Sequence, residues 1–326
     1  MKILVTGSAG FIGMHLSLKL SELGHHVYGI DNLNDYYDIN LKKSRLKVLK
    51  VKNFVFKKLD IFKKKELLKL FSNIKFDLVV HLAAQAGVRY SIENPDKYVE
   101  TNINGFLNIL DACYITSVKH IIYASSSSVY GNNKKIPFIE SDNTDKQISF
   151  YGVTKKSNEL MAHCYSHLHQ MSITGLRFFT VYGPWGRPDM APFLFAKSLI
   201  SGSPIKLFNN GEMLRDFTYI DDIIEALIRL ILKLPSTSKD NINLHNIYNI
   251  GNSEGVNLKR FVSALELNFR RKAIVDFAPI QKGDMKRTLS DSSKLEKFID
   301  FKPNTSIEDG IYKFVKWYKD FYKIDL

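Results

Sequence analysis

The feature that most constrains the fold is a short apolar segment followed at once by closely spaced glycines. Residues 2–6 read KILVT, which is typical of a buried strand. Gly7, Gly10 and Gly13 come next, and a helical pattern of leucines then runs to Gly24. Glycines in this setting allow a tight turn and a close approach of the backbone to a pyrophosphate at a helix N-terminus. The sequence therefore predicts a nucleotide-binding β-α-β unit.

The second predicted strand indicates which nucleotide binds. Residues 26–30 read HVYGI, and Asp31 and Asn32 follow them directly. An acidic side chain at this position accepts hydrogen bonds from the adenine ribose hydroxyls and repels a 2′-phosphate. We therefore expect NAD rather than NADP.

Strand and helix patterns alternate over the first half of the chain and then stop. Further strands are predicted at 54–59, 76–84 and 120–125, each followed by a helical pattern. Such alternation predicts an α/β fold with a doubly wound, Rossmann-like parallel sheet, whose ligands bind beyond the carboxyl ends of the strands. We expect an NAD-binding domain over residues 1–183 with a returning segment at about 221–245. Residues 184–220 and 246–326 would then form a smaller, discontinuous substrate lobe.

A Tyr-x-x-x-Lys spacing suggests a catalytic base. Tyr151 and Lys155 are about one helical turn apart, so they share a face of the predicted helix. An ammonium group beside a phenol favours the phenolate and lowers the pKa of the tyrosine, which can then take a proton from an alcohol. The serine run 125–128 can place a hydroxyl, that of Ser126, beside the phenol. An exposed helical pair is the alternative, and the glycine turn at the start of the chain weighs against it.

The composition and charge of the chain limit the kinds of partner that it can bind. The chain has 326 residues and a net charge of +13 from 46 basic and 33 acidic side chains. A basic balance can indicate a nucleic-acid binder, but the lysines are scattered and no aromatic-basic motif repeats. We favour a solvated, lysine-rich surface that attracts an anionic small substrate, and we expect no nucleic-acid partner.

Other sequence signals argue against membranes, disulfides and metals. No apolar run reaches the roughly 18 residues of a membrane span, and the N-terminus shows no signal peptide. Cys113 and Cys164 lie in helical patterns and are interpreted as core residues of a reducing compartment. No His/Cys cluster has metal spacing. We expect a cytoplasmic protein with no metal and no membrane contact.

The motifs in order resemble the extended short-chain dehydrogenase/reductase family and, within it, the NAD-dependent nucleotide-sugar 4-epimerases. The resemblance covers nearly the whole chain. The motifs that carry it are TGSAGFIG at 6–13, DNL at 31–33, DI at 60–61, HLAA at 81–84, TN at 101–102, the serine run, Tyr151 to Lys155, and RDF at 215–217. The segments at 34–37, 87–91 and 177–190 are most similar to those of UDP-glucuronate 4-epimerases.

The resemblance implies roles for many residues. In addition to the glycines, Asp31 and Asn32, those implied for NAD are Phe11, Ile12, Asp60, Ile61, Leu82, Ala83, Ala84, Asn102, Tyr151, Lys155 and Phe179. Those implied for the UDP part are Asp189, Lys206, Phe208, Arg215 and Asp284. Gln281 stands where galactose epimerases carry a phosphate-binding arginine, so Arg215, helped by Arg287, must carry more of the diphosphate charge. Arg89 can either reach the substrate or pair with a neighbouring acid.

The implied reaction is the reversible C4 epimerisation of UDP-glucuronate to UDP-galacturonate by transient oxidation with bound NAD. Dehydratases and decarboxylases of the family carry an acidic residue before Val-Tyr-Gly, and here that segment is all serine. The uronate carboxylate needs donors, for which we nominate Ser127, Ser128, Thr180 and Arg187. The alternatives are a 4-epimerase of UDP-glucose or UDP-N-acetylglucosamine and, more distantly, a non-catalytic NAD-sensing Rossmann protein. We expect a homodimer.

Overall fold

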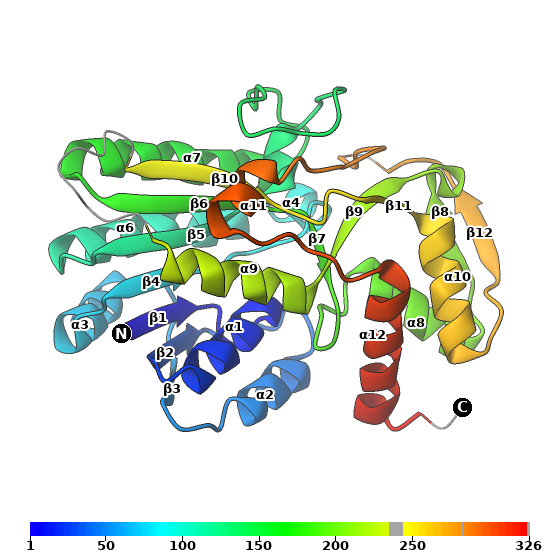
Figure 1. Ribbon diagram of the computed structural model, residues 1–326, viewed down its shortest axis with the longest axis horizontal. Coiled ribbons are helices and arrows are strands. Elements are labelled where there is room, and N and C mark those ends of the chain that lie inside the picture. The colour runs from blue at the N-terminus through cyan, green and yellow to red at the C-terminus, as the bar shows by residue number, and fades with distance from the viewer. Residues whose placement is uncertain (235–243, 282, 325–326) are drawn as a thin grey trace.

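A seven-stranded parallel sheet forms the centre of the molecule (Figure 1). The structure is a computed structural model that describes residues 1–234, 244–281 and 283–324. Within these residues the strand order is β10-β6-β5-β4-β1-β2-β3. The strands of this sheet are β1 (Lys2–Thr6), β2 (His26–Asp31), β3 (Phe54–Lys58), β4 (Leu78–His81), β5 (His120–Ser126), β6 (Ser172–Phe178) and β10 (His245–Ile250). This arrangement confirms the predicted doubly wound α/β fold.

Both faces of the sheet are buried, and successive side chains of each strand enter the cores on opposite faces. In β1, Ile3 and Val5 pack into one hydrophobic core, and Leu4 packs into the other. The first core includes side chains of α1 (Phe11–Glu22) and α9 (Ile220–Leu232), and these two helices contact each other. The second core is covered by α3 (Lys64–Ile74), α6 (Gly105–Ile115) and α7 (Phe150–His169).

The connections between strands contain the remaining elements of the large sheet's domain. The helical segment that leads into α6 is broken into short pieces, among them a six-residue π-helix, η1 (Val99–Asn104). The other elements are α2 (Ile39–Val48), α4 (Tyr90–Glu93), α5 (Pro95–Tyr98), the 3-10 turn η2 (Ser127–Tyr130) and α11 (Ser293–Ile299), which contacts β10.

A smaller lobe lies at the carboxyl end of the sheet (Figure 1). It contains a two-stranded parallel pair, β8 with β12, and a three-stranded sheet in the order β11-β9-β7. Helix α10 packs against both α8 and α12. The bounds are β7 (Thr180–Tyr182), α8 (Ala191–Ser201), β8 (Ile205–Phe208), η3 (Asn209–Gly211), β9 (Leu214–Tyr219), β11 (Gly255–Asn257), α10 (Leu258–Phe269), β12 (Val275–Ala278) and α12 (Ile307–Tyr322).

The predicted lobe boundaries are wrong at three elements. We assigned β7 to the NAD-binding domain, but it pairs with β9 of the smaller lobe, and we assigned α11 to the smaller lobe, but it packs on β10 of the large sheet. We assigned residues 246–326 to the smaller lobe, but β10 pairs in parallel with β6 and extends the large sheet by one strand. The polar segment that precedes β10 gave no sign of this pairing, because pairing partners are set by the tertiary fold. Residues 235–243 of the expected returning segment lie outside the described residues.

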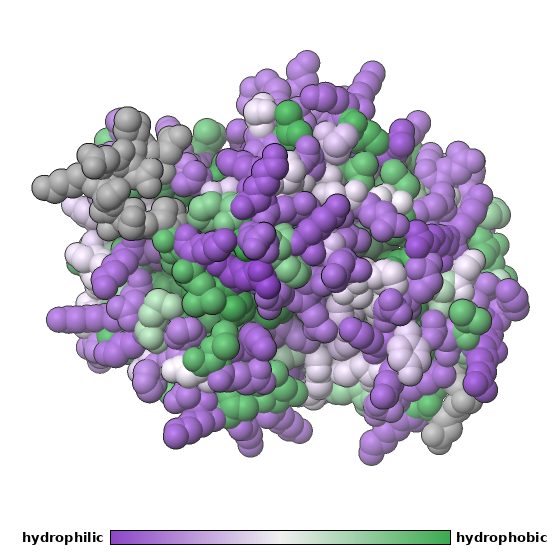
Figure 2. Space-filling view, in the orientation of Figure 1, coloured by the Kyte–Doolittle hydropathy of each residue, from purple (hydrophilic) through white to green (hydrophobic). Residues whose placement is uncertain are grey.

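The surface is mixed in character. Figure 2 shows hydrophilic side chains spread over one face, with smaller hydrophobic patches between them. Among the described residues, no helix has both the length and the apolar character needed to span a bilayer.

Candidate active site

The strand order reverses beside β1, with β2 on one side and β4 on the other, and a cavity opens at this point. Loops leaving adjacent parallel strands in opposite directions separate there, which is why doubly wound sheets bind ligands at the carboxyl edge. The cavity has a volume of about 430 Å³ and extends from the glycine turn after β1 to Tyr151 on α7.

The glycine turn is packed too tightly for side chains. Gly7 has a φ of +71°, and a Cβ placed on it would lie 2.9 Å from the Ala83 backbone nitrogen. A Cβ on Gly13 would lie 2.1 Å from the Gly7 carbonyl oxygen. Helix α1 begins at Phe11, directly after the turn, so its N-terminal N–H groups face the cavity. This cradle fits the diphosphate of a dinucleotide.

A hydroxyl on β1 fixes the neighbouring β4 end. Thr6 Oγ1 accepts hydrogen bonds from the backbone N–H groups of Leu82 and Ala83, at 3.1 and 3.0 Å. It is also hydrogen-bonded to His81 Nδ1 at 2.8 Å. Burial lowers the pKa of His81 to about 3, so the ring is neutral. His81 is therefore a structural residue.

Asp31 closes the end of the cavity expected to take adenosine. Its Oδ1 accepts from Leu33 N at 2.8 Å and its Oδ2 from Ala9 N at 3.2 Å. Burial raises the pKa of Asp31, and these two N–H groups oppose that rise. Asn32 Nδ2 donates to Asp60 Oδ2 at 2.8 Å, which joins the ends of neighbouring strands. The carboxylate therefore lies on the cavity wall, where it can accept further hydrogen bonds from a bound hydroxyl.

Nearly all the residues nominated for NAD lie on the cavity wall. They are Gly7, Gly10, Phe11, Ile12, Gly13, Asp31, Asn32, Asp60, Ile61, Leu82, Ala83, Ala84, Tyr151, Lys155 and Phe179. Asn102 is the exception. It is buried behind the wall, where its side chain accepts from Gln85 N at 2.8 Å and donates to Gln85 O at 3.0 Å and Thr154 Oγ1 at 3.0 Å. It holds the segment after β4 against α7, because the π-helical segment η1 turns it inward.

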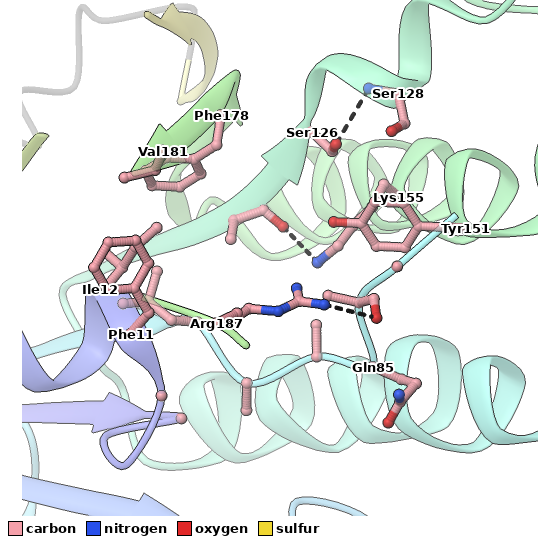
Figure 3. A pocket seen from close by; sticks show the side chains of 18 of the residues that line it. Phe11, Ile12, Gln85, Ser126, Ser128, Tyr151, Lys155, Phe178, Val181 and Arg187 are labelled. Atoms are coloured by element: carbon pink, nitrogen blue, oxygen red, sulfur yellow. Dashed lines mark hydrogen bonds between the residues drawn. The ribbon is translucent and has the colours of Figure 1, made fainter. Parts of the chain in front are cut away.

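Tyr151, Lys155 and Ser126 come together at the other end of the cavity (Figure 3). The Ser126 side chain lies beside the Tyr151 phenol and favours its ionised form. Lys155 Nζ donates to the Ala124 carbonyl at 2.7 Å, which ties α7 to the end of β5. The predicted grouping of a phenol, a hydroxyl and an amine in one site is present.

The electrostatics of this group differ from our expectation. Burial raises the pKa of Tyr151, and the nearby Ser126 side chain and the Arg187 charge only partly oppose that rise. Burial lowers the pKa of Lys155 to about 8. We expected the ammonium to lower the pKa of Tyr151, but in the structure burial outweighs the groups that favour the phenolate. The spacing of Tyr151 and Lys155 in the sequence predicts that they are close together, but it does not predict that both are buried.

Six of the residues nominated for substrate also line the cavity: Ser127, Ser128, Thr180, Arg187, Arg215 and Asp284. The Arg187 side chain extends across the cavity toward Tyr151 and Lys155 (Figure 3). Its Nη2 donates to the Ala86 carbonyl at 3.3 Å. Ser128 N donates to Ser126 Oγ at 3.1 Å, which orders the serine run.

The other five nominated residues lie off the wall. Asp189 forms a two-point ion pair with Arg187, with Nε to Oδ1 at 3.0 Å, and it also accepts from the Tyr36 hydroxyl at 3.0 Å. Asp189 therefore orients Arg187, and both of its oxygens are occupied. Lys206 and Arg287 are exposed.

The sequence left open whether Arg89 reaches the substrate or pairs with a neighbouring acid, and the structure shows an ion pair. Its Nη2 lies 3.2 Å from Asp284 Oδ2, and its guanidinium lies 4.9 Å from the centre of the Phe208 ring. It therefore pairs with an acid that is on the cavity wall. This pairing joins residues far apart in the chain, so no local pattern could have selected it.

Several wall residues were not anticipated. Tyr36, Tyr37, Lys42, Gln85, Ser149 and Thr288 all line the cavity. Tyr36 and Tyr37 belong to a segment that we singled out only by resemblance. The signal that could have nominated them is their position five and six residues after Asp31, in the loop that follows the second predicted strand.

In the part of the chain that the structure describes, no group of three or more His, Cys, Asp or Glu side chains could hold a metal ion.

The glycine cradle, the ribose-facing carboxylate and the Tyr-Lys-Ser group define a dinucleotide-dependent oxidoreductase-type site. Residues 3–251 match the NAD dependent epimerase/dehydratase family, and the chain belongs to this family.

Its relatives include sugar-nucleotide epimerases. Protein CapI of Staphylococcus aureus is 50% identical, over 99% of this chain and 100% of the relative. A probable UDP-glucuronate 4-epimerase of Rhizobium meliloti is 42% identical, over 99% and 98%. The UDP-glucuronic acid 4-epimerase of Bacillus cereus, solved in complex with UDP-glucuronic acid and NAD, is 36% identical with a TM-score of 0.90, over 99% of this chain and 100% of that one.

Proposed function

We propose that this protein interconverts UDP-glucuronate and UDP-galacturonate by inverting C4 of the sugar with bound NAD. The observation that carries the proposal is one cavity with two kinds of group at the same end. Tyr151, Lys155 and Ser126 can take the proton from an alcohol there while a bound dinucleotide would take its hydride, and serine, threonine and arginine donors stand beside them. The Bacillus cereus epimerase, similar over its whole length, was solved with UDP-glucuronic acid and NAD, which supports the same choice of ligands here.

Each residue of the catalytic group has a defined task. Tyr151 takes the proton of the sugar 4-hydroxyl, and the neighbouring Ser126 hydroxyl orients that proton. NAD held by the glycine turn and Asp31 would supply the hydride chemistry at C4, as acceptor and then as donor. Lys155 is held by the Ala124 carbonyl beside the site, where its ammonium favours the phenolate once the ligands exclude water.

A uronate imposes a further requirement. Oxidation at C4 makes the sugar a β-keto acid, in which the bond from C5 to the carboxylate breaks readily. The electron pair passes to the 4-keto oxygen, CO₂ leaves, and the resulting enolate takes up a proton. Neutral donors at Ser127, Ser128 and Thr180 and the Arg187 charge can hold the carboxylate out of the alignment for this loss. A neutral hexose would leave such donors unpaired, at about 1–3 kcal/mol each when buried.

The UDP part is proposed to bind against Arg215 and Asp284. Arg215 is on the wall, and burial lowers its pKa. Arg89, paired with Asp284, adds a second cation nearby. We propose that Arg89 takes the place assigned to Arg287, which is exposed, in compensating for the arginine absent at Gln281.

Product analysis tests the proposal. The purified protein is incubated separately with UDP-glucuronate, UDP-glucose and UDP-N-acetylglucosamine, and the products are resolved by chromatography. We expect UDP-galacturonate from the first at the highest kcat/KM, with NAD recovered in the denatured supernatant. A higher kcat/KM for either neutral sugar would overturn the substrate. No turnover of any sugar, with NAD bound, would favour the NAD-sensing alternative.

We also propose a homodimer formed through α6 and α7. On α7, Val153, Leu160 and Leu168 are 40–65% exposed and follow one face of the helix at helical spacing. Tyr114 at the end of α6 stacks on His169 of α7, with ring centroids 4.0 Å apart, so the two exposed faces are adjacent. An exposed apolar face of this extent on two neighbouring helices is typical of a subunit interface.

A further inference from the structure

Arg45 on α2 is a buried cation with no task in the proposed reaction. Its side chain is 0% exposed, and it is not part of the cavity wall. Among the described residues it forms no ion pair. Burying an unpaired charge is costly unless every donor is satisfied. The position of its hydrogen-bond partners therefore indicates what the residue does.

All five N–H donors of Arg45 have acceptors. Nε and Nη2 donate to the Trp185 carbonyl at 3.1 and 2.7 Å, and Nη2 also donates to the Gly186 carbonyl at 2.8 Å. Nη1 donates to the Ala9 carbonyl at 3.0 Å and to the Tyr37 hydroxyl at 2.6 Å. One guanidinium thus joins the glycine turn after β1 to the loop that follows β7. The rigid fork of arginine donors can do this, and the single nitrogen of a lysine cannot.

Two further contacts hold the same loop. His15 Nε2, on α1, is hydrogen-bonded to the Pro184 carbonyl at 3.1 Å. The Trp185 ring packs on α12, with its centroid 5.1 Å from that of Trp317 and 5.0 Å from that of Phe321. Trp185 has a φ of +62°, a left-handed conformation that a non-glycine residue adopts only when its surroundings impose it. The two hydrogen bonds from Arg45 to its carbonyl help impose it.

Arg187 comes directly after this clamped segment. Its charge opposes the rise in the Tyr151 pKa, and its side chain lies across the cavity from α7 (Figure 3). Any shift of the carbonyls of residues 185 and 186 moves the backbone from which Arg187 extends. Displacements of about 1 Å at an active site can cost about 100-fold in rate.

We propose that Arg45 is a positioning residue: it fixes the loop of residues 184–187 against the cofactor-binding turn and so sets Arg187 beside Tyr151. This inference rests on the proposed function, in which Arg187 holds the uronate carboxylate. It assigns to a buried residue of α2, outside the cavity, part of the control over whether the keto sugar is epimerised or loses CO₂.

The test compares Arg45→Lys and Arg45→Met with Arg271→Met. Arg271 is a matched control, because it also donates to a backbone carbonyl, that of Ile200 at 2.7 Å, but on the surface of the smaller lobe. The chain has two tryptophans, Trp185 and Trp317, so intrinsic fluorescence reports on the clamped loop. Emission, acrylamide quenching, bound NAD, epimerisation kinetics and the fraction of turnovers that release CO₂ are measured for each variant.

We expect Arg45→Lys to retain NAD while its tryptophans become more quenchable. Its kcat/KM for UDP-glucuronate should fall about 10- to 100-fold, and its CO₂ fraction should rise, with Arg271→Met unchanged. The proposal would be overturned if Arg45→Lys matched the parent within twofold in tryptophan quenching, in kcat/KM and in the fraction of turnovers that release CO₂. A loss of activity that only tracks lost NAD, or failure of both Arg45 variants to fold, would also overturn it by assigning a purely structural role. If the parent protein does not epimerise UDP-glucuronate, the proposed function fails, and the quenching comparison still decides whether Arg45 holds the loop.

Discussion

At the scale of single residues, Tyr151 has a hydroxyl neighbour that favours its ionised form, but its burial favours the neutral phenol. It lies beside Ser126 and is faced by the Arg187 charge, yet burial keeps its pKa raised. For Tyr151 to act as the proposed base, the cations around it must offset this cost of burial.

Tyr151→Phe should abolish turnover and spare binding. We expect kcat for UDP-glucuronate to fall by about 10²–10⁴-fold, since proton transfer from the 4-hydroxyl is lost. The Kd for UDP-glucuronate, measured by calorimetry, should stay within about threefold because the UDP contacts are elsewhere. Tyr165→Phe is the control on the same helix, where the hydroxyl donates to Asp111 away from the cavity. Near-parental turnover by Tyr151→Phe would exclude it as the base.

Lys155 should make the stability of the NAD-free protein depend on pH. Burial lowers its pKa from 10.5 to about 8. Between these values the unfolded chain holds a proton that the folded chain has released, so stability rises with pH through this window. Below about pH 8 both states carry the charge, and the native state bears a cost of about 3 kcal/mol. Above about 10.5 both are neutral and this cost is absent.

The variant Lys155→Met isolates this effect. Its free energy of unfolding relative to the parent should be most favourable at pH 7, and that advantage should shrink by about 3 kcal/mol as the pH approaches 10. Urea unfolding of both NAD-free proteins at the two pH values measures the change. A difference between the proteins that does not vary with pH would contradict the buried-charge assignment.

At the scale of elements, a buried ion pair holds the catalytic helix to the sheet. Glu159 on α7 and Arg177 on β6 are each 3% exposed, with Nε to Oε1 at 2.8 Å and Nη2 to Oε2 at 2.9 Å. Ser125 Oγ also donates to Glu159 Oε1 at 2.6 Å. The residue before Ser126 is thereby fixed to the helix that carries Tyr151 and Lys155.

Removing one partner of this pair should be strongly destabilising. We expect Glu159→Gln to lower the free energy of unfolding by about 3–5 kcal/mol, because Arg177 would be left as a buried, uncompensated charge. Glu225→Gln is the control: Glu225 and Arg229 form an i,i+4 pair on α9 at 2.6 Å, but both are about 40% exposed. That loss should cost only about 0.3–0.5 kcal/mol. Equal losses in denaturant unfolding would show that burial does not matter here.

At the scale of the whole molecule, the proposed dimer would cover the exposed stripe on α7. Leu160→Arg places a charge at a position that is 59% exposed in the single chain and central to the stripe. We expect light scattering after gel filtration to report a dimer for the parent and a monomer for this variant. Leu267→Arg is the control, since Leu267 is 77% exposed on α10 in the smaller lobe. A parent that is monomeric, or a Leu160→Arg variant that remains a dimer, would refute the interface.

The course of the chain through the two lobes explains why the cavity lies where it does. After β6 the chain leaves the large sheet and forms β7 of the smaller one, α9 returns to pack on α1, and β10 re-enters the large sheet beside β6. Residues Arg187, Arg215 and Asp284 thus reach the same cavity wall from separate segments of the chain. The end of the cavity at the glycine turn is built from the large sheet, and the wall at Arg215 comes from the smaller lobe.

Local patterns were enough to predict much of this molecule. The strand, glycine turn and helix at residues 2–24, the carboxylate at Asp31 and the one-turn spacing of Tyr151 and Lys155 all depend on neighbours in sequence. Steric limits on the turn and the two periodicities of strand and helix operate over a few residues, so a sequence records them directly. The parallel sheet followed from alternation of these units.

The remaining features depended on contacts between distant segments. Strand β10 pairs with the large sheet, and Asn102 is buried behind the cavity wall. Asp189 forms an ion pair with Arg187, and burial raises the pKa of Tyr151. Pairing partners, solvent exclusion and charge neighbours are set by which segments meet in space. Residue type and spacing do not predict which segments contact each other. The same side chain can bind a ligand or a neighbouring side chain with the same hydrogen bonds.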